Sequence, residues 1–207
     1  MINKGKVISL KSVKNINFFS KNKHLLLICC VFLIGVFSSI LLYKSFSFPW
    51  QVAFNRLYLL RGKLSLLKSY ALSFGLSATV IAVIFIFGTS MMGQGIIPCI
   101  NYLIGYFMGS VSAYLYTTYS LKGVAFNLLL IIPSGFIFIL LSFFAAKAAM
   151  EYSINLSKLA TKKAPVPGGI IQFKNYARLF LILIIISAVS SIIETLIIKL
   201  CLGFFNF

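Results

Sequence analysis

Acidic residues are almost missing from this chain. Among its 207 residues there is no aspartate, and Glu151 and Glu194 are its only glutamates. Charged residues of both signs make up 10% of the chain, whereas a soluble domain has about a quarter. The chain therefore lacks the polar surface of a soluble domain, and it has no paired carboxylates for acid–base hydrolysis.

Residues that bind metals or act as nucleophiles are also scarce. The single histidine is His24, and the four cysteines show no CxxC spacing, so the ligand sets of zinc sites are missing. The sequence contains no HExxH, GxSxG or Walker A motif, and the serines and threonines within its apolar runs have no aspartate or histidine to activate them. We therefore expect no catalytic residue, no cofactor and no metal site, and we interpret the cysteines as small apolar packing residues.

Hydrophobic residues, in contrast, form long uninterrupted runs. They make up 60% of the chain, whose mean hydropathy is +1.03. Five runs approach the roughly 20 residues that a helix needs to cross a bilayer. These runs cover about 25–43, 70–92, 96–116, 124–146 and 179–198. Because the backbone must satisfy its own hydrogen bonds in lipid, the sequence predicts an all-α polytopic membrane protein with about five transmembrane helices.

Turn-forming residues separate these runs. The glycines of 93–95 lie between the second and third runs, and Ser120-Leu121-Lys122-Gly123 lies between the third and fourth. The proline- and glycine-rich stretch 165–169 interrupts the longer connection before the fifth. We expect a basic cytoplasmic segment, 1–24, followed by a single helical membrane domain, 25–207.

Basic residues give the chain a formal charge of +17. In a soluble protein this charge would suggest nucleic acid, but beside transmembrane runs it favours contact with anionic lipid headgroups, and we expect no nucleic-acid partner. Six basic residues precede the first run and six lie within 147–178, whereas the connections on the other side hold five, one and one. The positive-inside rule therefore predicts an N-terminus inside the cell membrane and a C-terminus outside.

The connection between the first two runs, 44–69, has an apolar stripe of its own. Apolar residues recur at three- and four-residue steps: Trp50, Phe54, Leu57, Leu60, Leu64 and Leu67. This spacing predicts an amphipathic helix at the membrane surface. It would act as a simple anchor, as a docking face for a partner outside the membrane, or as a hairpin that dips partway into the bilayer.

Polar residues inside the runs are candidate intramembrane sites. Glu194 lies late in the fifth run, where an acid needs a partner or a proton, and an ion site, a structural bond and an interfacial position all remain open. Pro133, Ser134 and Gly135 fall near the middle of the fourth run and predict a kink there. A broken helix of this kind can form a substrate site in a transporter.

Small residues recur every four positions in the third run. Gly105, Gly109 and Ala113 form a stripe that allows two helices to approach closely. The stripe would pack inside the bundle or join two copies of the chain.

The order of features in the middle of the chain resembles the stage II sporulation protein M family. The features are the segment 86–93, the hairpin and glycine-bearing run after it, the Lys122-Gly123 turn, the Pro133 break and the late acid Glu194. The chain departs from the family pattern at Ser134, where many members have a bulkier polar residue, and at Phe138, where many have an acid. The similarity covers roughly 70–200.

The resemblance implies five spans and a non-enzymatic membrane scaffold. Such a scaffold would anchor peptidoglycan-degrading enzymes at the sporulation septum, where wall thinning lets the mother-cell membrane engulf the forespore. Its partners would be peptidoglycan hydrolases or other membrane proteins, docked on Trp50, Phe54, Leu57, Leu60 and Leu64. The alternative is a permease-like transporter subunit that works with a separate ATPase, because the chain itself has no nucleotide-binding motif.

Overall fold

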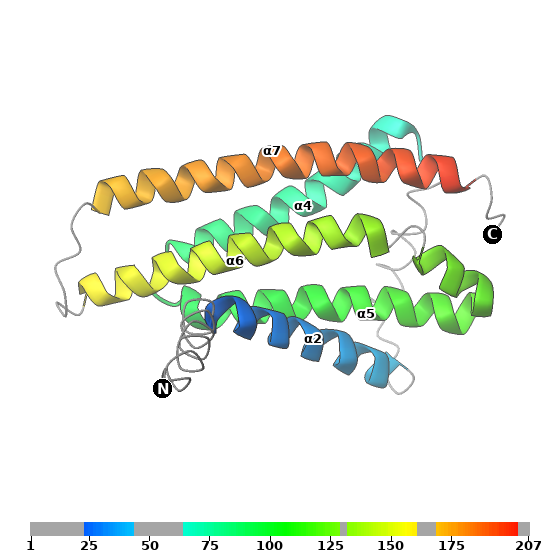
Figure 1. Cartoon of the computed structure of the whole chain (residues 1–207), viewed down its shortest axis with the longest axis horizontal. Helices are drawn as coiled ribbons and strands as arrows, with labels where there is room; N and C mark the ends of the chain where they lie inside the picture. The colour runs from blue at the N-terminus through cyan, green and yellow to red at the C-terminus, as the bar shows by residue number, and fades with distance from the viewer. Residues whose placement is uncertain (1–22, 44–63, 129–131, 161–168, 203–207) are drawn as a thin grey trace, which may run out of the picture.

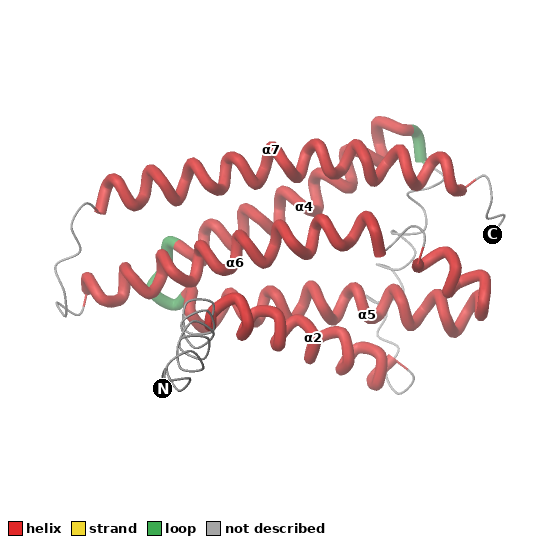
Figure 2. The backbone as a smooth tube through the Cα atoms, viewed as in Figure 1, coloured by secondary structure: helices red, strands yellow, loops and turns green. Residues whose placement is uncertain are grey.

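The structure is a computed structural model that describes residues 23–43, 64–128, 132–160 and 169–202. These residues form five helices and no strand (Figures 1 and 2). The helices are α2 (Lys23–Tyr43), α4 (Leu66–Gly88), α5 (Gly93–Phe126), α6 (Ile132–Ala160) and α7 (Gly169–Leu202). All five are long and apolar enough to cross a membrane. The predicted all-α polytopic membrane fold is therefore confirmed, while the expected interfacial helix falls mostly outside the described residues.

The helices run up and down along one common direction (Figure 1). We call the end that holds Lys23 and the Thr89–Met92 turn the hairpin end, and the opposite end, where α5 turns back at Ser120, the turn end. Helices α2 and α5 run in the same direction and form one closely packed pair, and α4 and α7 run in opposite directions and form a second. Helix α6 contacts all four others and joins the two pairs.

The buried apolar core lies towards the hairpin end. It is built from the first part of α2, α5 and α7, the later part of α4 and the middle of α6. Its members are Ile28, Ile81, Ile84, Ile97, Leu141, Ala145, Ala146, Ala149, Met150, Tyr176, Phe180 and Leu183. The outward faces carry large exposed apolar side chains, as a bundle surrounded by lipid requires.

The expected break between the third and fourth runs is confirmed as a sharp turn within α5. Ser120 has φ 48° and ψ −127°, a conformation that non-glycine residues rarely adopt. After it the chain folds back, and a Cβ on Gly123 would collide with the carbonyl oxygen of Leu115. The hydrogen bond from Asn127 Nδ2 to the Tyr116 hydroxyl, at 2.6 Å, fastens the returning segment to α5.

The predicted kink at Pro133 stays a prediction, because residues 129–131 before it lie outside the described part of the chain. Helix α6 begins at Ile132 and not near Val124, so Pro133 occupies the first helical turn and Gly135 follows in the same turn. Proline is well accommodated there, because the first N–H groups of a helix have no intrahelical partner to lose. The apolar run that begins at Val124 is split between the returning part of α5 and the start of α6, and run length alone cannot show this division.

Candidate functional site

The α2/α5 pair is held by glycines. A Cβ on Gly35 would meet the carbonyl oxygen of Tyr102, and a Cβ on Gly105 would meet that of Phe32, both closer than real Cβ contacts allow. On Gly109 it would lie 2.7 Å from the carbonyl oxygen of Val36. The two backbones therefore touch, and the stripe of Gly105 and Gly109 faces α2 within the same chain.

Polar side chains add to the α2/α5 contact. The hydroxyls of Ser38 and Tyr102 are 2.9 Å apart. Ser39 is fully buried beside Gly109, and its Oγ has no hydrogen-bond partner. Asn101, also fully buried, donates from Nδ2 to the carbonyl oxygen of Ile97 at 3.0 Å, within its own helix. This interface is thus tight and only partly satisfied in its hydrogen bonds.

The α4/α7 pair is lined by hydroxyl groups instead. Along α4 they recur at steps of four, and along α7 they do the same in the opposite direction. The series are Ser69, Ser73 and Ser77 on α4, and Ser187, Ser191 and Thr195 on α7. All but Ser77 are at most 2% exposed. We call this set the hydroxyl seam.

The register of α4 against α7 puts the two series at the same levels. At the hairpin end Gly88 lies against Tyr176, and at the turn end Lys199 Nζ donates to the carbonyl oxygen of Leu64 at 2.7 Å. Ser77 lies eleven residues before Gly88 and Ser187 lies eleven residues after Tyr176, so the two serines are at the same level, and the following pairs stay in step towards the turn end. Sequence analysis missed this seam, although two period-four series of hydroxyls were there to find.

Glu194 lies beside the hydroxyl seam, one position before Thr195. It is half-buried on α7, in the half of the helix nearest the turn end. The Lys199 ammonium donates its hydrogen bond to the carbonyl oxygen of Leu64. This agrees with the helical spacing, which places Lys199 away from Glu194. Pro133 is exposed, Gly135 is buried, and a Cβ on Gly135 would lie 2.9 Å from the flexible end of Met108. The intramembrane polar and packing candidates thus lie on three helices, with Glu194 on α7, Pro133 and Gly135 on α6, and Gly105 and Gly109 on α5.

A second polar set fastens the hairpin end. Ser153 of α6 donates to the carbonyl oxygen of Ser90 at 2.7 Å, and Gln94 Nε2 donates to Ser157 Oγ at 3.2 Å. Tyr176 of α7 donates to the carbonyl oxygen of Phe85 at 3.0 Å. These bonds attach the α4–α5 turn to both later helices.

Aromatic rings surround Tyr176. Its ring is stacked between Phe85, at a centroid distance of 5.1 Å, and Tyr152, at 4.4 Å. Phe180 adds a third ring contact at 4.7 Å. Such ring pairs contribute beyond their buried area, so this cluster is the main side-chain contact of the α4/α7 pair at the hairpin end.

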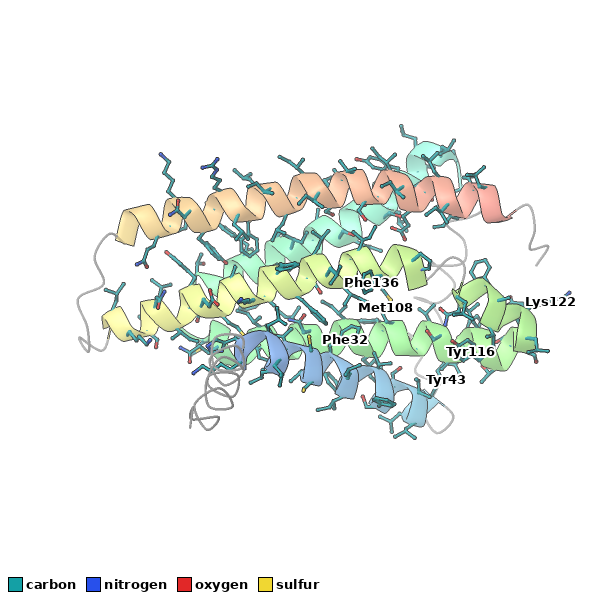
Figure 3. All side chains as sticks on the ribbon, in the orientation of Figure 1. Phe32, Tyr43, Met108, Tyr116, Lys122 and Phe136 are labelled. Atoms are coloured by element: carbon teal, nitrogen blue, oxygen red, sulfur yellow. The ribbon has the colours of Figure 1, made fainter. Side chains whose placement is uncertain are left out.

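Tyrosines mark the turn end of α2 and α5. Figure 3 shows Tyr43 at the end of α2, with Tyr116 and Lys122 farther out, where α5 turns back. Tyrosine is common at membrane interfaces because its ring is apolar and its hydroxyl is polar. The turn end therefore has the chemistry of a headgroup layer.

Of the five candidate docking residues, the structure describes Leu64 alone. Leu64 is half-buried just before α4, and its carbonyl oxygen receives the bond from Lys199. Trp50, Phe54, Leu57 and Leu60 lie outside the described residues. Among the residues that the structure describes, no group of three or more histidine, cysteine, aspartate or glutamate side chains could hold a metal ion.

Comparison with known proteins places this bundle in a family. No curated protein and no solved structure matches the chain. The family model described as Stage II sporulation protein M matches residues 24–197, which cover most of the chain and parts of all five helices. The chain therefore belongs to the stage II sporulation protein M family.

Proposed function

We propose that this protein is a non-enzymatic membrane scaffold that anchors peptidoglycan-degrading enzymes for septal wall thinning and engulfment during endospore formation. The observation that carries the proposal is the family match over residues 24–197. This match supports a sporulation-related membrane protein, and to this we add the role of a scaffold.

The architecture supports a scaffold. Nearly all described residues belong to membrane-crossing helices, and the α4–α5 connection is only the four residues Thr89–Met92. The described part of the chain is therefore a lipid-embedded bundle, without an extramembrane domain to carry chemistry of its own. This form supports a role in anchoring other proteins at the membrane.

The candidate docking segment connects α2 to α4. Helix α2 ends at Tyr43 and α4 begins at Leu66, both at the turn end (Figure 1). Both helix ends that flank the candidate docking segment therefore lie at that end. With the N-terminus inside, as the charge distribution favours, this is the outer side of the membrane, where wall-degrading enzymes work.

The docking segment can be tested by charging its apolar stripe. Leu57, Leu60 and Leu64 are changed together to Asp, and the protein is crosslinked in membranes of sporulating cells and purified with its partners. We expect the peptidoglycan hydrolases recovered with the native protein to be lost. The matched control changes Gln51, Asn55 and Gly62 to Asp, which adds the same charge off the stripe.

Each result separates two readings. Loss of hydrolases with the stripe variant but not the control, at equal membrane insertion, supports the docking segment. Retention of hydrolases by the stripe variant would show that they dock elsewhere. Absence of hydrolases from the native sample would contradict the scaffold itself.

The transporter alternative keeps one specific observation in its favour. The hydroxyl seam and the half-buried Glu194 form a polar strip inside the bundle. An ATPase in the same crosslinked sample, in place of hydrolases, would favour this function and make Glu194 the first residue to change.

A further inference from the structure

Two basic side chains lie one turn apart near the start of α7. Lys174 and Arg178 are both exposed, and residues four apart on a helix have Cβ atoms about 5–6 Å apart. Neither forms an ion pair with the described residues, whose acids are Glu151 on α6 and the distant Glu194. Two cations at this spacing can both donate hydrogen bonds to the oxygens of one phosphate group.

The same face of α7 continues as an apolar surface. Leu181 is 62% exposed and Ile185 64%, and each follows one of the two basic residues by seven positions, or about two turns. Val189, four residues further, is 53% exposed. A ligand with an anionic head and a long apolar body would therefore contact one unbroken stripe of this helix.

The level of the two cations matches the edge of a bilayer. Tyr176 lies between them in sequence and donates to Phe85, three residues before the end of α4. Lys174 and Arg178 thus flank the level at which α4 ends and the chain turns towards α5. Basic residues at that depth meet phosphates, while the side chains that follow meet acyl chains.

Basic residues at the turn end are arranged differently. Lys199 donates to the carbonyl oxygen of Leu64. Lys68 and Lys122 are exposed, but they come from α4 and from the returning part of α5. Among the described residues, only α7 at the hairpin end carries two exposed cations one turn apart above an exposed apolar stripe.

We propose that Lys174 and Arg178 form a binding site for the headgroup of an anionic phospholipid, whose acyl chains lie along Leu181, Ile185 and Val189. The site holds one lipid of the leaflet at the hairpin end. It does not depend on the scaffold function, and either proposal can fail alone.

Native mass spectrometry tests this site directly. The full-length protein, purified in detergent, is titrated with phosphatidylglycerol and, separately, with phosphatidylcholine. We expect one phosphatidylglycerol to bind tightly, and we expect its affinity to fall about 25-fold when Lys174 and Arg178 are both changed to Gln, at about fivefold per basic residue. Phosphatidylcholine should bind weakly and equally to both proteins.

A matched variant removes the same charge from the turn end. Changing Lys68 and Lys122 to Gln should leave the affinity for phosphatidylglycerol within about twofold of the native value, because these two lysines lie at the turn end, away from the site. Glycerol phosphate, which has the headgroup chemistry without acyl chains, should not displace the lipid. An equal loss of affinity in both double variants would overturn the proposal in favour of nonspecific charge, and displacement by glycerol phosphate would show a phosphate site without a lipid contact.

Discussion

The two helix pairs of this bundle are built on opposite packing principles. In α2/α5 the backbones touch, because Gly35 and Gly105 leave no room for a Cβ. In α4/α7 every residue of the hydroxyl seam carries a Cβ, and the Tyr176 ring of α7 stacks on Phe85 of α4 at a centroid distance of 5.1 Å. The first pair depends mainly on glycines that bring two backbones together, and the second mainly on its side chains, with Gly88 making room for Tyr176 and Ala149.

The difference teaches how helices associate where lipid offers no hydrophobic driving force. Association there relies on van der Waals contact and on hydrogen bonds between helices. The α2/α5 pair increases contact by bringing backbones together. The α4/α7 pair uses large rings at the hairpin end and small hydroxyls farther along, so its tolerance to substitution should change along its length. Four predictions test this contrast, from the largest expected effect to the smallest.

Removing the ring of Tyr176 should damage the α4/α7 pair most. Tyr176 is 6% exposed and is stacked between Phe85 and Tyr152. We expect Tyr176→Ala to lower the free energy of unfolding by about 3–5 kcal/mol, the usual loss for a buried aromatic ring. Reversible unfolding in mixed detergent micelles, followed by circular dichroism, measures it.

Phe173→Ala is the control for Tyr176→Ala. Phe173 is 45% exposed, and its ring contacts Tyr152 at a centroid distance of 6.3 Å. Its loss should change the free energy of unfolding by less than about 1 kcal/mol. Equal losses at the two positions would mean that the ring stack does not hold α4 and α7 together.

Adding one methyl group should be enough to damage the α2/α5 pair. A Cβ on Gly35 or Gly105 meets a backbone oxygen that cannot swing aside. We expect Gly35→Ala and Gly105→Ala each to cost about 1–3 kcal/mol, the range for overpacking. Gly75→Ala makes the same change on α4, where nothing lies within 4 Å of the new Cβ. If all three variants were equally stable, close backbone contact would not be what holds this pair.

The sequence predicts the kind of residue at a helix contact better than it predicts which two helices form that contact. The four-residue spacing of Gly105 and Gly109 is visible in the sequence and predicts close packing. The spacing cannot name α2 as the partner, because any helix with a matching small residue would fit. Gly35 supplies the match, and a single glycine in an apolar run gives no signal of its own.

The fourth helix shows a second limit of sequence reasoning. Hydropathy places a run at 124–146 and makes Pro133 its middle. In the structure this run is divided. Ser120 and Gly123 fold the chain back, so the run begins in the returning part of α5, and α6 begins only at Ile132. The apolar composition of the run is compatible with one continuous helix and also with the divided arrangement. The packing of the returning segment against α5 decides between the two.

The shortest hydrogen bond between the hairpin and α6 should have an intermediate effect. Ser153 is fully buried and donates to the carbonyl oxygen of Ser90 at 2.7 Å. We expect Ser153→Ala to lower the free energy of unfolding by about 0.6–1.5 kcal/mol, as for hydrogen bonds between membrane helices and in proteins generally. Thr79→Ala is the control, since Thr79 is exposed and bonds only within its own helix, to Gly75. A cost at Ser153 no larger than at Thr79 would argue that the bond does not attach the hairpin.

The smallest effect should come from the hydroxyl seam itself. Ser187 is 1% exposed and its Oγ has no hydrogen-bond partner, so Ser187→Ala removes an unsatisfied polar atom while keeping the Cβ. We expect a change near zero or a slight gain, because a buried unpaired hydroxyl carries a desolvation penalty. Ser187→Leu at the same site should instead cost about 1–3 kcal/mol by overpacking. If Ser187→Ala destabilised the bundle as much as Gly105→Ala does, the seam would be held by its hydroxyls, and the contrast between the two pairs would be one of polarity rather than of side-chain size.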